Sequence, residues 1–362
     1  MIKILSVVGA RPNFMKVAPI HRAFCKAQDR FEHSIVHTGQ HYDAVMSDAF
    51  FADLEMPAPS FFLGVGSGTH AEQSAKVMVG FENVVNTYQP DYVIVVGDVN
   101  STIACALTSV KMGIQTGHVE AGLRSGDRTM PEEINRLATD AIVDDLFVTE
   151  QSGIDNLKSE GVSADRIHMV GNTMIDSLLW ALPKSKSSTI HQRCDIVPGN
   201  YVVATLHRPS NVDDTQQLRM LVGALAKIAT HAPVVFPVHP RTKKHIVESE
   251  IIIPDGVIMI DPVGYVDFLA LLKDARCVLT DSGGIQEETT ALGVPCVTAR
   301  TTTERPITIT LGTNMLVAPQ HDLIVLAVLS IINGNIPSGS VPPMWDGLAA
   351  ERIVSTLDKR YA

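Results

Sequence analysis

The stretch ARCVLTDSGGIQEE, residues 275–288, begins with an apolar run and passes through two adjacent glycines into a segment of helical composition. This order predicts a strand, a tight turn and the start of a helix. The first turn of a helix has unpaired backbone N–H groups, and Gly283 and Gly284 lack a Cβ, so a diphosphate can approach the main chain there. Ser282 adds a hydroxyl, and Glu288 is placed to hold a ribose diol. The stretch indicates a nucleoside diphosphate site, although a plain loop with a capped helix explains it equally well.

The same alternation of apolar runs and amphipathic segments extends along the whole chain. Between the first two runs, Val17, Ile20 and Phe24 recur at helical spacing and predict a helix packed on a sheet. Residues 183–199 are rich in Lys, Ser, Thr and Pro, which predicts a linker. We therefore predict an α/β protein with two doubly wound, parallel-sheet domains. The predicted strands are residues 2–8, 34–37, 92–96, 114–118, 146–149 and 167–170, then 201–206, 234–238, 257–260, 275–279 and 295–298.

The composition narrows the class of protein. Of the 362 residues, 45% are hydrophobic and 19% are charged, which is enough apolar material for two buried cores. The net charge of −10 argues against a nucleic-acid partner or an anionic membrane surface. The five cysteines form no C-x-x-C pair and predict reduced thiols and a cytoplasmic location rather than disulfides or a zinc site. Residues 1–8 are too short for a signal peptide, and no apolar run approaches the ~20 residues of a membrane span.

Three carboxylates follow predicted strands of the first half. They are Asp98 in VVGDVNST, Glu120 in HVEAGLRSG and Glu132 in MPEEINR. Each has an ordinary explanation, since Asp caps helices and glutamates after a proline are typical of a first helical turn. Together, however, they fall at one edge of the predicted sheet, among the arginines at 124, 128 and 136. Like charges gathered in one place raise carboxylate pKa values, and this favours general acid and base chemistry.

Cationic side chains also follow the predicted strands. Arg11 and Lys16 come after the first strand, His207 and Arg208 after the strand at 201–206, and Arg305 after the strand at 295–298. Each favours contact with a phosphate or carboxylate, although a solvated helix start explains a single pair as well. No GxGxxG motif follows the first strand, so we expect no nicotinamide cofactor.

Ten segments follow one another along nearly the whole chain: GARPNFMK, TGQHYD, GDVNST, HVEAGLRSG, MPEEINR, VGNTMIDSL, LHRPSN, DPVGY, TDSGGIQEE and TTERP. In this order they resemble the non-hydrolysing UDP-N-acetylglucosamine 2-epimerases. The resemblance implies two Rossmann-like domains that face each other across a cleft, as in GT-B glycosyltransferases. It also implies a C-terminal helix within residues 346–362 that returns to the first domain, residues 1–182, while residues 200–345 bind the nucleotide.

The resemblance also implies roles for individual residues. The catalytic residues would be Asp98, Glu120, Glu132, His207 and Lys16. Gln40 and His41 match an allosteric activator site, although the neighbouring Tyr42 and Asp43 differ from the family pattern. The residues in contact with the UDP-sugar would be Arg11, Lys16, Asp98, Glu120, His207, Val263, Phe268, Ser282, Gly283, Gly284, Glu288 and Arg305.

The implied reaction is inversion of C2 of a UDP-2-acetamido sugar by elimination and re-addition of UDP, most directly UDP-N-acetylglucosamine to UDP-N-acetylmannosamine. It requires no metal or cofactor, and the family implies a homodimer that serves polysaccharide biosynthesis. Relatives that act on UDP-diacetamido-uronic acids share the TGQHYD and DPVGY segments, and the chain has His207, Arg208, Pro209 and Ser210 where the family often has His-Arg-Arg-Glu. The alternatives are such a uronic acid epimerase, a hydrolysing 2-epimerase, a GT-B glycosyltransferase and a nucleotide-sugar-binding regulator without activity.

Overall fold

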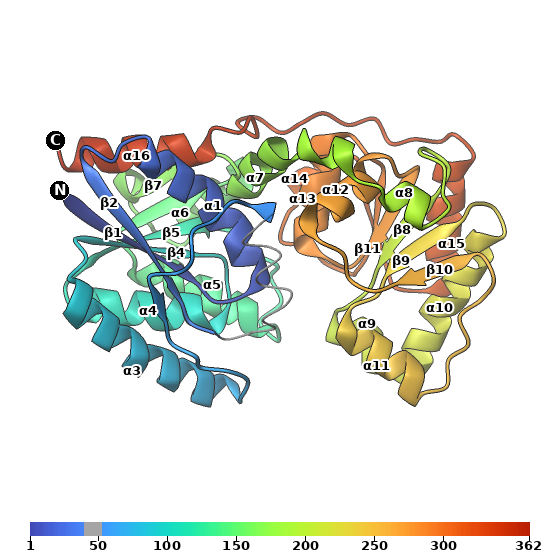
Figure 1. Ribbon diagram of the computed structural model, residues 1–362, viewed down its shortest axis with the longest axis horizontal. Coiled ribbons are helices and arrows are strands. Elements are labelled where there is room, and N and C mark those ends of the chain that lie inside the picture. Colours follow the sequence, from blue (N-terminus) through green and yellow to red (C-terminus); the bar gives the residue numbers. More distant parts are fainter. Residues whose placement is uncertain (40–52) are drawn as a thin grey trace. The chain divides into compact units, whose positions relative to one another are not determined.

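The computed structural model describes residues 1–39 and 53–362, apart from the Arg11 side chain. It divides the chain into two compact units, which are described one at a time. Unit 1 comprises Met1–Trp180 and Pro343–Ala362, and unit 2 comprises Ala181–Pro342. Figure 1 labels their helices and strands.

Unit 1 is built on a seven-stranded sheet in which all neighbouring strands are parallel. The chain starts in the middle of the sheet at β1, winds outward through β2 and β3, and then winds the other way from β4. Loops that follow β1 and β4 therefore diverge, and this point of a doubly wound sheet is where ligands bind. The order is β3 (Phe61–Phe62), β2 (Phe31–His37), β1 (Ile2–Val8), β4 (Tyr92–Val96), β5 (Gln115–Ala121), β6 (Asp145–Val148) and β7 (Ile167–Met169).

Helices cover both faces of this sheet. Val17, Ile20 and Phe24 are buried on one side of α1, as their spacing predicts. The helices in the described residues of unit 1 are α1 (Arg11–Cys25), α3 (His70–Tyr88), α4 (Asn100–Lys111), α5 (Pro131–Ile142), α6 (Gln151–Ser159), η1 (Ala164–Arg166), α7 (Thr173–Ala181, whose last residue begins unit 2) and α16 (Ala349–Arg360).

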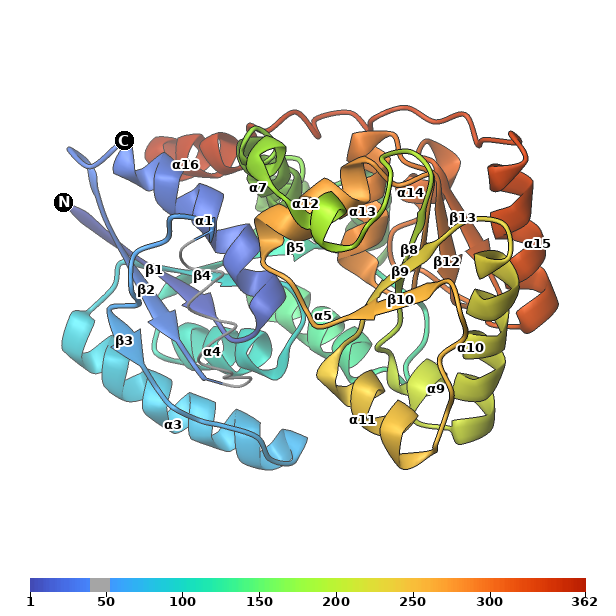
Figure 2. The same ribbon diagram turned by 45° about the vertical axis from the view of Figure 1, so that its right-hand side comes forward.

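The C-terminal helix α16 packs beside α1, as both ribbon views show (Figures 1 and 2). Asp176 of α7 accepts hydrogen bonds from the backbone N–H groups of Ala349 and Ala350, at 3.2 and 2.8 Å. This carboxylate satisfies donors that a helix start leaves unpaired. At the other end of α16, Arg360 forms an ion pair with the buried Asp145 at the start of β6. The last segment of the chain is therefore part of unit 1.

Unit 2 contains a six-stranded parallel sheet whose winding reverses between β8 and β11. The order is β10 (Val257–Ile260), β9 (Val234–Pro237), β8 (Val202–Thr205), β11 (Cys277–Thr280), β12 (Cys296–Ala299) and β13 (Asn314–Val317). Its helices are η2 (Lys184–Ser187), α8 (Ile190–Arg193), α9 (Pro209–Val212), α10 (Thr215–Ala229), α11 (Pro240–Glu248), α12 (Tyr265–Lys273), α13 (Gly283–Leu292), α14 (Ile307–Thr310) and α15 (His321–Ile332).

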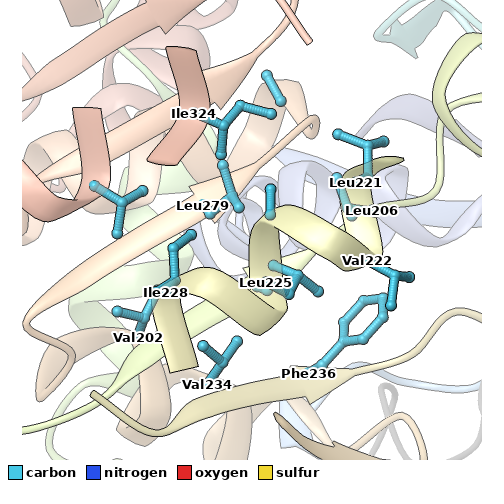
Figure 3. Packing of buried hydrophobic residues seen from close by; sticks show 14 of the residues in the cluster. Val202, Leu206, Leu221, Val222, Leu225, Ile228, Val234, Phe236, Leu279 and Ile324 are labelled. Carbon is cyan, nitrogen blue, oxygen red and sulfur yellow. The ribbon is translucent and has the colours of Figure 1, made fainter. Parts of the chain in front are cut away.

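Two apolar layers enclose this second sheet. On one face, Leu225 and Ile228 of α10 pack against Val202, Val234 and Phe236 of the strands (Figure 3). The core on the other face includes the buried residues Ile190, Cys194 and Ile196. These three lie in the segment 183–199, so the residues whose composition predicts a linker form η2 and α8 and join the core of unit 2.

The predicted fold class, two doubly wound parallel sheets, is confirmed. Every predicted strand matches an observed one, but β3 and β13 were not predicted. Both are edge strands, and β3 has only two residues. Short edge strands have weak apolar patterns because they bury little surface. In the described part of the chain no helix combines the length and hydropathy that a membrane crossing requires.

Candidate functional site

In unit 1, Lys16 and Glu120 form an ion pair at the carboxyl edge of the sheet, and both side chains are only 7% exposed. Lys16 lies in the helix after β1 and Glu120 near the end of β5. Gly97, directly after β4, lies between them with φ +67°, and a Cβ built there would be 2.9 Å from Lys16 Nζ. Asn13 links the ends of β1 and β4. Its side chain accepts hydrogen bonds from Gly9 N–H and Ala10 N–H and donates one to the Val96 carbonyl oxygen. The pair therefore lies at the point where the winding of the sheet reverses.

The backbone of Glu120 adopts an unusual conformation. Its φ is +76°, which is rare for a residue with a side chain, and the β5–β6 register shifts between Val119 and Ala121. Such a bulge turns one side chain away from the strand's regular alternation. Strained backbone of this kind concentrates at functional sites. The sequence predicts the strand to end at His118, whereas it continues to Ala121 with Glu120 inside it.

Asp98 is paired rather than acting as a helix cap. Arg136 Nη1 lies 2.5 Å from Asp98 Oδ2, and Asn135 Nδ2 donates to the Asp98 carbonyl oxygen at 2.9 Å. The N-cap of α4 is Val99. The cap interpretation of Asp98 is therefore wrong, and its side chain, 28% exposed, lies at the same edge of the sheet as Glu120.

The two adjacent glutamates of α5 have different environments. Glu133 is buried, accepts hydrogen bonds from the N–H groups of Ser125 and Gly126, and contacts Arg136 at 2.6 Å. Burial opposes its ionisation, but these donors hold the pKa of Glu133 below its ordinary value. Glu132 is exposed, and among the described residues it has no hydrogen bond or ion pair. Of these two glutamates, only Glu132 is exposed to solvent.

In unit 2, the His207 side chain is held by Asp281. His207 Nδ1 lies 2.8 Å from Asp281 Oδ1, and Asp281 also accepts from the N–H groups of His207 and Arg208. Asp281 is fully buried, and burial opposes its ionisation, yet the hydrogen bonds and charge of His207 keep the pKa of Asp281 below its ordinary value. The Nδ1 hydrogen therefore points to a carboxylate, and the half-exposed ring presents Nε2.

Ser282 is the N-cap residue of α13, and Gly283 and Gly284 form its first turn. A Cβ on Gly283 would lie 2.6 Å from Arg305 Nη1, so the guanidinium packs directly against this turn. Arg305 is buried, with Glu287 at 2.9 Å and Glu304 at 2.7 Å.

Glu304 joins a larger group of charges beside this turn. It also contacts Arg300 at 2.9 Å and Arg208 at 3.5 Å. Burial opposes its ionisation, but the arginines lower the pKa of Glu304 well below its ordinary range. The cluster of Arg208, Arg300, Arg305, Glu287 and Glu304 thus has three cations and two anions. This positive excess at a helix N-terminus favours an anionic ligand.

The remaining predicted residues of unit 2 lie at the same carboxyl edge. Glu288 is buried and accepts a hydrogen bond from the Tyr265 hydroxyl at 2.9 Å. Val263 and Phe268 are partly buried and pack at the margin of the core that contains Ile285. An apolar margin beside the start of α13 suits a planar base. Of the predicted residues, the Arg11 side chain and the residues Gln40 and His41 lie outside the described part of the chain.

Several residues of these sites were not predicted from sequence, among them Asn13, Glu287, Arg300 and Glu304 of the contacts above, and Asp281, His118 and Asp140. Asp281 has the clearest signal, since it immediately precedes Ser282 at the end of a strand. His118 and Asp140 are fully buried and contact each other at 2.6 Å. They are 22 positions apart in the sequence, and nothing in the pattern links them.

Known proteins share this architecture. A family model described as UDP-N-acetylglucosamine 2-epimerase matches residues 23–358. The UDP-N-acetylglucosamine 2-epimerase of Methanocaldococcus jannaschii is 39% identical, with 98% of this chain and 99% of that protein covered. The UDP-2,3-diacetamido-2,3-dideoxy-D-glucuronate 2-epimerase of Pseudomonas aeruginosa is 42% identical, with 99% and 100% covered.

A solved structure gives the same result. The M. jannaschii enzyme, crystallised with UDP-GlcNAc and UDP, superimposes with a TM-score of 0.92 over 99% of this chain and 100% of that chain, at 39% identity. Sequence and fold agree, and this chain belongs to the UDP-N-acetylglucosamine 2-epimerase family.

Proposed function

We propose that this protein is a non-hydrolysing UDP-N-acetylglucosamine 2-epimerase that interconverts UDP-N-acetylglucosamine and UDP-N-acetylmannosamine. The observation that carries the proposal is the set of three carboxylates and one lysine at the carboxyl edge of the sheet in unit 1. The positive cluster at the start of α13 supports it from unit 2, because it suits a nucleoside diphosphate.

The reaction must begin at C1. The C2 hydrogen of a 2-acetamido sugar is not next to a carbonyl group, so a carboxylate cannot remove it directly at a useful rate. When the C1–O bond breaks, its electron pair leaves with UDP and positive charge develops at C1. A carboxylate then takes the C2 proton, and a 2-acetamidoglucal with a C1–C2 double bond forms. Protonation of C2 from the opposite face and return of the UDP oxygen to C1 complete the inversion.

The proposed roles follow from charge and environment. Lys16, Arg11, His207 and the Ser282 turn stabilise the negative charge that develops on the leaving diphosphate. Two of Asp98, Glu120 and Glu132 exchange the C2 proton, one on each face, and the third orients the sugar. We assign one of the exchanging positions to Glu132, because it is exposed while its neighbour Glu133 is bound to the chain.

The nucleotide part is assigned to unit 2. Gly283 and Gly284 offer main-chain N–H groups to the diphosphate, and Arg305 supplies charge beside them. Glu288 binds the ribose diol through the carboxylate that Tyr265 orients. Val263 and Phe268 contact the uracil ring.

A UDP-diacetamidoglucuronate is the second candidate substrate. The relative named for UDP-2,3-diacetamido-2,3-dideoxy-D-glucuronate is 42% identical over 361 residues, and the relative named for UDP-N-acetylglucosamine is 39% identical over 365. These two sequence identities are too similar to indicate which of the two sugars is the substrate. A carboxylate at C5 of the sugar would distinguish them, and only a direct assay of both decides.

The test is incubation of the protein with each nucleotide sugar in D₂O, followed by NMR. Deuterium at C2 together with a new manno resonance from UDP-N-acetylglucosamine supports the main proposal. The same signals from the diacetamidoglucuronate alone support the second. Free sugar and UDP as products indicate a hydrolysing enzyme, and binding without exchange of either sugar contradicts epimerisation.

Several expectations stay predictions. A homodimer is tested by sedimentation, and a cytoplasmic location by fractionation. A role in polysaccharide biosynthesis is tested by deletion of the gene. Activation through Gln40 and His41 predicts a sigmoidal dependence of rate on UDP-N-acetylglucosamine. The domain assignment predicts that residues 200–345 hold the determinants of UDP binding.

A further inference from the structure

The three carboxylates of the proposed site come from three different elements of unit 1. Asp98 follows β4, Glu120 lies in β5 and Glu132 lies in the first turn of α5. Catalysis needs each of their oxygens held within about 0.5 Å of its productive position. The three elements must therefore be fixed relative to one another, and Arg136 and Asn135 of α5 already bind Asp98 at the end of β4.

His118 and Asp140 connect these three elements. His118 lies in β5 and Asp140 in α5, and the His118 Nδ1 to Asp140 Oδ1 distance is 2.6 Å. The other ring nitrogen, Nε2, lies 2.7 Å from the carbonyl oxygen of Gly97, the residue before Asp98. One buried chain of hydrogen bonds thus runs from α5 through β5 to the end of β4.

The Asp140 carboxylate also holds the Glu120 bulge from both sides. Its Oδ1 contacts His118, two residues before Glu120, and its Oδ2 accepts the N–H of Gly122, two residues after Glu120, at 3.0 Å. Glu120 lies midway with φ +76°. A left-handed conformation at such a residue persists only where its surroundings hold it.

Asp140 has several partners in this buried network. A backbone carbonyl only accepts, so His118 Nε2 donates to Gly97. Asp140 Oδ2 also contacts Arg124 Nη1 at 2.7 Å, and Arg124 in turn contacts Glu160 at 2.8 Å. Burial opposes ionisation of Asp140, but His118 and Arg124 keep the pKa of Asp140 below its ordinary value.

We propose that His118 and Asp140 are positioning residues for catalysis: they hold Glu120 and the Gly97–Asp98 turn relative to α5 without contacting the substrate. The inference rests on the proposed epimerase function. It predicts that Asp140→Asn and His118→Gln lower kcat about 100-fold, the effect expected of an ångström-scale displacement. Because neither residue contacts the substrate and the proposed contacts to uracil and ribose lie in unit 2, the affinity for UDP should change little.

Two conservative variants separate the contacts of His118. His118→Asn keeps a donor where Nδ1 faces Asp140, and His118→Gln keeps one where Nε2 faces Gly97. Because Asp140 holds both sides of the bulge, the Asn variant should retain more activity than the Gln variant. If the two residues served only the stability of the fold, the variant with the lower activity would also have the lower Tm.

The matched control is His168→Asn, which removes the Nε2 donor that contacts Asp145 just as His118→Gln removes the Nδ1 donor that contacts Asp140. His168 Nε2 pairs with Asp145 Oδ1 at 2.8 Å in the same unit, but at the start of β6 and away from the carboxylates. The experiment measures kcat, KM, deuterium incorporation at C2, UDP affinity by calorimetry and Tm for all variants. A loss of kcat in the His118 and Asp140 variants that the control lacks supports the inference. The inference is overturned if the wild type is active and the His118 and Asp140 variants keep its kcat. It is also overturned if the control variant loses as much kcat as they do at an equal Tm. A wild-type protein that epimerises no UDP-2-acetamido sugar overturns the proposed function, and this inference with it.

Discussion

Lys16 Nζ and the Glu120 carboxylate form a buried ion pair in which the two residues come from opposite sides of the point where the sheet winding reverses. The pair brings a cation proposed for the diphosphate together with a carboxylate proposed for the sugar. Its burial makes it sensitive to the loss of either partner, because an unpaired buried charge is costly.

The first prediction concerns this pair. Lys16→Met and Glu120→Gln should each lower the free energy of unfolding by about 3–5 kcal/mol, because each leaves one buried charge unpaired. The double variant should be destabilised by clearly less than the sum of the two. Urea unfolding of the four proteins measures the coupling, and strictly additive losses would show that the two side chains do not interact. All three variants should lose C2 exchange.

Gly97→Ala tests the close approach at the switch point. The added Cβ would meet Lys16 Nζ at 2.9 Å, and φ is +67°. Gly113→Ala is its control, since Gly113 has φ +76° with no atom within 4 Å of a built Cβ. Both should lose roughly 1–2 kcal/mol from the left-handed backbone. Only Gly97→Ala should also lose activity, and equal kcat values in the two variants would contradict the assigned place of Lys16.

The neighbouring glutamates of α5 should give opposite results. Glu132→Gln should fold with an unchanged Tm but lose deuterium incorporation, because the exposed carboxylate is assigned to proton transfer. Glu133→Gln should lose about 1–3 kcal/mol of stability, because it weakens hydrogen bonds to Ser125, Gly126 and Arg136. If Glu132→Gln exchanges the C2 proton at the wild-type rate, its catalytic assignment is wrong.

Asp281→Asn should change the orientation and tautomer of His207 while the fold is kept. An amide in place of the carboxylate no longer accepts reliably from Nδ1, so we expect about a 100-fold lower kcat. Asp274→Asn is the comparison, since Asp274 lies 3.5 Å from His191 in the same unit. Steady-state kinetics of both variants provide the measurement. Equal rates for the two would exclude a functional role for the His207–Asp281 pair.

Asp176 predicts a pH dependence of stability. Burial raises its pKa to about 6 from 3.8, despite the N–H groups of Ala350 and Ala349. A carboxyl group with a raised pKa in the folded state favours folding when protonated. Its contribution is thus present below pH 4 and is lost as the pH rises from about 4 to 6, by roughly 3 kcal/mol in total. The free energy of unfolding of the wild type should therefore fall relative to that of Asp176→Asn as the pH rises over this range. Chemical unfolding of both proteins at pH 4 and pH 7 measures this change. A constant difference would show that Asp176 has an ordinary pKa.

Much of the fold was predictable because parallel strands buried on both faces form short apolar runs. Residues 2–8, for example, match β1 along its whole length. The edge strand β13 was missed because a four-residue segment that includes Asn314 has no distinct pattern. The linker prediction at residues 183–199 rested on polar composition, whereas Ile190, Cys194 and Ile196 pack in the core of unit 2.

The sequence by itself determined the two doubly wound sheets, the family and the residue types available at the strand ends, because local periodicity and short motifs carry that information. Only the tertiary structure decided which of two adjacent glutamates is exposed, that Asp98 pairs with Arg136, and that Asp140 binds both flanks of the Glu120 bulge. These relationships depend on distances of a few ångströms between residues far apart in the chain, and no local pattern encodes such distances.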